Sequence, residues 1–199
     1  MNMLIDLLPK TVEIDNKEYD INWDFRTSIL FEIMMQDEEL TEEEKIVQAL
    51  RLYYPEIPTN IEKAIEKFLW FYKCGKKDRK VKGNKSIDNG VKQIYSFDYD
   101  DEYIYSAFID QYKIDLQDIE GFHWWKFKAM FKGLKSDNEI VKIMGYRSMT
   151  IDKKMTQEEK DFYSKMKRLY EIPISESEQE KLDAITKALM SDGDLSKVL

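Results

Sequence analysis

Residues 122–134, FHWWKFKAMFKGL, hold the densest run of aromatic side chains in this chain, and these side chains recur at helical spacing. At 100° of rotation per residue, one broad apolar face collects Trp124, Phe127, Met130, Phe131 and Leu134. A second apolar face carries Phe122, Trp125 and Ala129, beside Gly133. Two apolar faces require packing layers on two sides. We therefore predict a central helix in a mainly α, bundle-like domain.

The remaining strip of this helix is basic. Lys128, Lys132 and Lys135 follow one another at spacings i, i+4 and i+7, and Trp124 and Trp125 flank them. The two rings can lie against the lysine stems, so part of the aromatic surface is expected to stay near water. We predict that these five side chains form a partner-binding surface.

Five helix-start signals favour a mainly helical chain. In each, a serine or threonine is followed three residues later by glutamate, ahead of an apolar-periodic segment. The pairs are Thr41 with Glu44, Thr59 with Glu62, Ser136 with Glu139, Thr156 with Glu159, and Ser175 with Glu178 or Ser177 with Glu180. Asp24 is a further candidate cap. The predicted helices cover residues 25–35, 41–53, 59–72, 100–111, 119–134, 138–144, 157–171 and 178–190.

A small β element precedes the helices. Short strands are predicted at Leu4–Leu8, Thr11–Ile14 and Glu18–Ile21, and the polar turn Asp15–Lys17 joins the last two. The fold class is therefore mainly α with an amino-terminal β-hairpin.

Length and composition favour one domain. The 199 residues, 43% of them hydrophobic, suffice for a single core, with a β element at 1–22, helices at 24–72, a basic flexible loop at 73–92 and helices at 98–199. In that loop, Lys73–Lys85 holds seven basic residues and one acid, within a chain of net charge −8. Such a block indicates either a solvated loop drawn to the chain's own acidic surface or a tether for an acidic partner or nucleic acid.

Composition disfavours several classes of function. The net charge of −8 and the pI near 4.9 disfavour a surface that coats nucleic acid. Cys74 is the single cysteine and His123 the single histidine, which disfavours disulfides and zinc clusters. We expect His123 to be neutral in the core and Cys74 to be a free thiol whose pKa neighbouring lysines lower somewhat.

No motif points to catalysis. The chain has no P-loop, G-x-G-x-x-G, G-x-S-x-G or H-E-x-x-H. The acids Asp98, Asp100, Asp101 and Glu102 lack the spacing of a calcium loop, so we assign them to the amino terminus of a helix. We predict no catalytic residue, no cofactor, no metal and no enzymatic activity.

A series of short motifs points to a family. Y-I-Y-S-A-F at 103–108, Q-Y at 111–112, I-D-L at 114–116, H-W-W-K-F at 123–127, I-M at 143–144 and Y-R at 146–147 follow one another, and L-I-D-L-L-P opens the chain at 4–9. This order resembles the bacteriophage gene product fifteen family, small proteins of long-tailed phages and prophages. The best match covers roughly residues 98–149. We do not expect the resemblance to extend to the basic loop or to the acidic helix from Glu178.

The resemblance implies a function. Members are typically encoded between the tail-tube and tape-measure genes, which implies a tail assembly chaperone. The expected partner is the tape-measure protein or a tail-tube subunit, in the cytoplasm of the bacterial host. The first residues lack the regions of a signal peptide, and no apolar run approaches a membrane span, so we expect a soluble protein without a membrane partner.

Two other functions are open from the residues. Ser136–Arg147 could form the helix and turn of a helix-turn-helix nucleic-acid-binding regulator, with the basic loop holding phosphates. The acidic pI argues against it. An enzyme of a kind that carries none of the familiar motifs is the third interpretation.

Overall fold

The computed structural model describes residues 1–76 and 93–173. Within them the chain forms a mainly α fold with a small β-hairpin, as predicted. The elements are β1 (Thr11–Ile14), β2 (Lys17–Asp20), α1 (Phe25–Met35), α2 (Glu42–Tyr53), α3 (Ile61–Tyr72), α4 (Asp101–Tyr112), α5 (Trp124–Lys132), α6 (Glu139–Ser148) and α7 (Gln157–Leu169). The predicted helix at 178–190 and most of the predicted basic loop lie outside the described residues.

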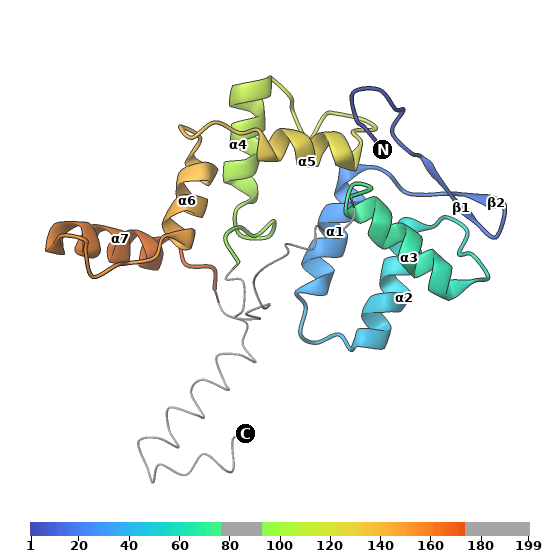
Figure 1. The fold of residues 1–199 in the computed structure, drawn as a ribbon, viewed down its shortest axis with the longest axis horizontal. Coiled ribbons are helices and arrows are strands. Elements are labelled where there is room, and N and C mark those ends of the chain that lie inside the picture. Colours follow the sequence, from blue (N-terminus) through green and yellow to red (C-terminus); the bar gives the residue numbers. More distant parts are fainter. Residues whose placement is uncertain (77–92, 174–199) are drawn as a thin grey trace, which may run out of the picture.

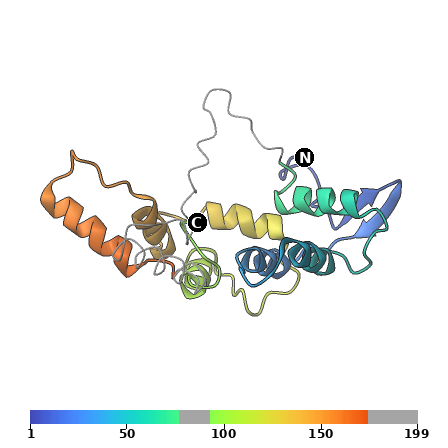
Figure 2. The same cartoon turned by 90° about the horizontal axis from the view of Figure 1, so that it is seen from below.

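Helix α5 joins two groups of elements. The hairpin and α1–α3 lie at one end of it, and α4, α6 and α7 lie toward the other (Figure 1). Along the chain α1 packs on α2 and α5, α2 on α3, and α3 on β1, while α6 packs on α4 and α7. Figure 2 shows α5 at the middle of this arrangement.

The hairpin confirms two predicted strands and corrects the third. β1 and β2 pair antiparallel, with Ile14 opposite Lys17, and both turn residues, Asp15 and Asn16, have positive φ, as a two-residue hairpin turn requires. Residues 4–8 are not a strand. Instead, Asn2 Oδ1 accepts the Leu4 N–H and Asp6 Oδ2 accepts the Asn2 N–H, which closes a turn, an alternative to sheet pairing that short polar side chains offer.

Local capping signals placed some helix starts and missed others. Thr41 and Thr156 form complete capping boxes at α2 and α7. At α3 the cap is Asn60 rather than Thr59, and α6 begins after Asn138 rather than Ser136. Asn60 also donates to Asp15 in the hairpin turn, so the cap residue links α3 to the hairpin. The fifth predicted box lies outside the described residues.

Helix α5 starts later than predicted because the residues before it pair with the segment before α1. Trp124 donates its N–H to the carbonyl of Trp23, and Phe25 donates to the carbonyl of Phe122, each at 2.9 Å. His123 is the N-cap, with its Nδ1 accepting the Trp125 N–H at 3.1 Å. Residues 119–123 therefore hold α1 and α5 together instead of extending the helix.

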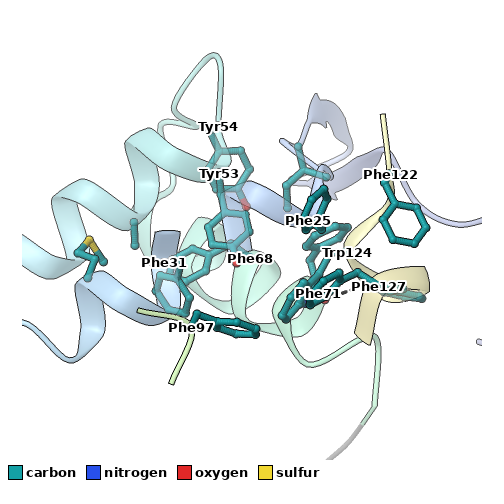
Figure 3. Packing of buried hydrophobic residues seen from close by; sticks show 14 of the residues in the cluster. Phe25, Phe31, Tyr53, Tyr54, Phe68, Phe71, Phe97, Phe122, Trp124 and Phe127 are labelled. Atoms are coloured by element: carbon teal, nitrogen blue, oxygen red, sulfur yellow. Dashed lines mark hydrogen bonds between the residues drawn. The ribbon is translucent and has the colours of Figure 1, made fainter. Parts of the chain in front are cut away.

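The core is aromatic and centres on Phe127, which is fully buried. Its ring stacks on Phe108 of α4, Phe25 of α1 and Trp124, with centroids 4.9, 5.0 and 5.7 Å away. Figure 3 shows Phe25, Trp124 and Phe127 together beside the second aromatic group around Tyr53 and Phe68. One side chain of α5 thus contacts helices from both groups of elements.

Candidate partner-binding surfaces

The two tryptophans of the predicted surface are buried. Trp124 and Trp125 are each 1% exposed, and their indole N–H groups donate to the carbonyls of Tyr72, at 2.9 Å, and Phe71, at 2.7 Å. These carbonyls belong to the last turn of α3, where backbone acceptors lack partners within the helix. The expectation that aromatic surface stays near water is therefore wrong for both rings. Binding of a partner near them is still a prediction.

The three lysines of the predicted surface differ in environment. Lys128 is half-buried, with its Nζ 4.3 Å from the centre of the Tyr72 ring and 4.8 Å from that of Trp124, and burial lowers its pKa. Lys132 and Lys135 are exposed. Ala129, which the sequence placed on an apolar face, is also exposed.

An apolar pocket of about 350 Å³ lies beside these lysines, between α5 and α6. We call it the α5–α6 pocket. Its walls include Tyr95, Phe131, Leu134, Val141 and Met144, and the side chains of Lys128 and Lys132 also line it. It therefore combines aromatic and methionine surface with two cations.

The charges near this pocket are mainly positive. Lys76, Lys128 and Lys132 surround Cys74, but burial outweighs them and raises the pKa of this thiol, which corrects the expected lowering. Glu32 is a nearby acid: its Oε1 accepts a hydrogen bond from the Tyr95 hydroxyl at 2.8 Å, whereas its buried Oε2 has no hydrogen-bond partner among residues 1–76 and 93–173. The surroundings of the pocket thus favour ligands that bring carboxylates.

A buried ion pair joins the start of α4 to the last turn of α6. Asp100 and Arg147 bond through both carboxylate oxygens, at 2.5 and 2.9 Å, with side chains 2% and 6% exposed. Arg147 also donates to the carbonyls of Tyr170, at 2.6 Å, and Ile94, at 3.2 Å. Asp100 was predicted to act at the start of α4. It stands at the N-cap position but makes no side-chain cap, because Arg147 and the Ser96 N–H engage its oxygens.

This pair bears on the helix-turn-helix alternative. That alternative made Ser136–Arg147 the helix and turn of a nucleic-acid reader, with the basic loop holding phosphates. In the structure Arg147 is buried against Asp100, and Lys142 pairs with Glu139 at 3.1 Å. The segment therefore gives the alternative no support.

Sequence reasoning did not find a second apolar groove. A groove of about 710 Å³ lies between α1 and α4, lined by Ile29, Leu30, Ile104 and Leu116 among others. We call it the α1–α4 groove. Arg26 lines it and donates to the carbonyl of Leu116 at 2.6 Å. Each helix showed only its own apolar stripe, so no sequence signal indicated that the two would face each other.

The described residues contain no group of three or more His, Cys, Asp or Glu side chains placed to hold a metal ion. Among the helices described, none is long and apolar enough to cross a membrane.

A family model described as "Bacteriophage Gp15 protein" matches residues 4–172. The match runs across the positions of the basic loop, contrary to expectation, and ends before Glu178. Comparisons with curated proteins and with solved structures give no match.

Proposed function

We propose, because the chain belongs to the bacteriophage Gp15 protein family, that this phage protein is a tail assembly chaperone that binds the tape-measure protein or a tail-tube subunit. The α5–α6 pocket is the observation that supports this proposal, and we take it as the binding surface. It lies at the lysines that the sequence singled out and offers aromatic and methionine side chains. We place the tape measure ahead of the tube subunit, because its long apolar helical stretches need shielding before assembly.

The chemistry of the pocket suits a helical client. An amphipathic helix binds by inserting apolar side chains into a groove, and methionine adapts its shape to different occupants. Met144 and Leu134 would contact the apolar stripe of the client, while Lys128 and Lys132 would pair with carboxylates beside that stripe. Binding should therefore be mainly apolar, with a small contribution from charge.

Titration of the full chain with tape-measure fragments tests this proposal. Met144→Glu places a carboxylate in the pocket and should weaken binding at least tenfold. Leu169→Glu is the matched control, because Leu169 is an aliphatic residue 64% exposed on α7, away from the pocket. Thermal unfolding of both variants checks that the fold is kept. Equal affinity for Met144→Glu and Leu169→Glu would place the client elsewhere.

Salt dependence separates the chaperone from the regulator. Apolar binding should be weakly salt-dependent and show a negative heat-capacity change. A grip on about six phosphates would instead give a slope near −5 in log affinity against log salt, at about −0.9 per contact. Tight duplex DNA binding with that slope, and none to tape-measure fragments, would exclude the chaperone.

A further inference from the structure

The chain leaves α7 beside the α5–α6 pocket. The carbonyl of Tyr170 accepts a hydrogen bond from Nε of Arg147 at 2.6 Å, and Nη1 of the same guanidinium donates to the carbonyl of Ile94 at 3.2 Å. Ile94 also lines the pocket. Arg147 therefore holds the chain that leads into residues 174–199 close to one wall of the pocket.

The sequence of residues 174–199 combines an apolar stripe with acids. Leu182, Ile185 and Leu189 recur at spacings i, i+3 and i+7 within the helix predicted at 178–190. Residues 174–199 carry six acids and three lysines, and four of the acids lie between positions 176 and 183. We call residues 178–190 the acidic segment. Its pattern is typical of a helix that binds in an apolar groove beside cations.

The α5–α6 pocket has the complementary chemistry. Its apolar walls include the half-buried side chains of Phe131, Val141 and Met144. Lys128 and Lys132 are the charged residues that line it, and neither forms an ion pair with a carboxylate within residues 1–76 and 93–173. Because Lys128 is half-buried, an incoming carboxylate would offset part of the cost of desolvating its charge.

Charge favours this segment and this site over the alternatives. The segment 77–92 lies just before Ile94 in the chain, but it carries six cations and two acids, so the lysines of the pocket would repel it. The α1–α4 groove is lined by Asp101 and Glu102, which would repel the acidic segment. The α5–α6 pocket thus suits the acidic segment in charge as well as in apolar surface.

We propose that the acidic segment docks in the α5–α6 pocket of its own chain and closes it until a client displaces the segment. The eight residues 174–181 span up to about 26 Å when extended, at about 3.3 Å each, which exceeds the breadth of a pocket of about 350 Å³. The competition with a client rests on the proposed function, because it takes the client to use this pocket. The docking itself does not.

Docking within one chain has a consequence for client binding. A tethered segment competes at a high effective concentration, so a contact that is weak in isolation is enough to close the pocket. The apparent affinity for a client then falls by the fraction of molecules whose pocket is open. If about one pocket in ten is open, release of the segment should raise the apparent affinity about tenfold.

NMR of methionine methyl groups in the full chain tests the docking without a client. A spin label on Lys187→Cys, in a Cys74→Ser background, should broaden the methyl signal of Met144 and spare that of Met155. Met144 lines the pocket, whereas Met155 lies just before α7 and does not. The label sits off the apolar stripe, so it leaves the proposed contact intact.

A second pair of changes identifies the contact. Ile185→Ser with Leu189→Ser removes most of the apolar stripe and should restore the Met144 signal. Leu195→Ser with Val198→Ser is the matched control, because both residues are aliphatic and lie outside the acidic segment. This control should keep the broadening.

Three NMR results would overturn the docking. The first is a sharp Met144 signal in the labelled chain, and the second is broadening that persists after the changes at Ile185 and Leu189. The third concerns a mixture of spin-labelled copies with separate copies that carry ¹³C-methionine. Equal broadening of Met144 in that mixture would show that the segment binds a second copy.

Tape-measure fragments test the competition. The full chain with Ile185→Ser and Leu189→Ser should bind them about tenfold more tightly than the wild type, and the control with Leu195→Ser and Val198→Ser should match the wild type. Equal affinities in the presence of a docked segment would overturn the competition. Absence of binding by all three proteins would overturn it together with the chaperone function, whereas the NMR result decides the docking in either case.

Discussion

Arg147 is the side chain at which three separate segments meet. Its guanidinium bonds Asp100 before α4, the carbonyl of Ile94, and the carbonyl of Tyr170 after α7. The two charged side chains are buried, so the cost of desolvating each is offset only while the other is in place. Arg147, the last residue of the segment considered as a helix-turn-helix reader, therefore has a structural role.

Removing one partner of the Asp100–Arg147 ion pair should strongly lower the free energy of unfolding. Asp100→Leu leaves the Arg147 charge buried without its partner and should lower the free energy of unfolding by about 3–5 kcal/mol. The double variant Asp100→Leu with Arg147→Met removes both charges and should recover most of that loss. Denaturant unfolding of the three proteins measures this. A single-variant cost below about 1 kcal/mol would show that water reaches the pair.

His123 shows how one cap fixes a protonation state. Its Nδ1 accepts the Trp125 N–H and so carries no proton, which leaves Nε2 to donate to the carbonyl of Pro9. Burial lowers the pKa of His123 below its ordinary value of 6.5. The neutral core histidine expected from the sequence is thus found, at the start of the helix rather than within it.

This lowered pKa predicts a pH dependence of stability. As pH falls below 6.5, the unfolded chain binds a proton before the folded chain does, so the free energy of unfolding should decrease down to the folded pKa. NMR titration of the single imidazole should give a pKa below 6.5. His123→Asn keeps an N-cap acceptor and should remove this part of the pH dependence. A folded pKa at or above 6.5 would contradict the arrangement.

Helix α7 differs from the other helices in its attachment. It has no fully buried residue, and its capping box at Thr156 and Glu159 is local. It packs against α6. The Tyr146 ring of α6 lies edge-on to Phe162 of α7 and stacks on Tyr170, just beyond α7, and the ring centroids of both pairs are 6.0 Å apart. By contrast α5 contributes three fully buried aromatic side chains.

Amide hydrogen exchange should show different protection for α7 and α5. Amide protons of α7 should exchange through local opening, well before those of α5, because little apolar area resists the opening. Thr156→Ala removes the cap, worth about 1 kcal/mol in typical helices, and should speed exchange in α7 while leaving α5 unchanged. Equal protection in both helices would show that α7 opens only with the whole molecule.

At the level of the whole molecule, Phe127 connects the two groups of elements through stacks on Phe25 and Phe108. The single domain predicted from the sequence implies that these groups unfold together. Phe127→Ala should cost about 3–5 kcal/mol, as large core truncations do. Tryptophan fluorescence and far-ultraviolet circular dichroism should give coincident transitions in the wild type. Separated transitions would instead define two units.

Local sequence patterns predicted the fold class, the family and most of the helices. Apolar periodicity placed α1 at its exact bounds, and the pairs at Thr41 and Thr156 located α2 and α7, because these signals act between residues within one or two helical turns. Lys128 and Lys132 were likewise visible as neighbours on one helix, whereas Lys135, expected on the same strip, lies beyond the end of α5 at Lys132.

Which side chains are buried and which are exposed depends on long-range packing. Burial of Trp124 and Trp125 depends on carbonyls of α3 more than fifty residues earlier, and the pairing of Asp100 with Arg147 depends on how α4 meets α6. The α1–α4 groove exists only because α5 holds those helices at its two sides. Contacts between residues distant in sequence depend on the path of the whole chain, whereas periodicity and caps report only the residues beside them.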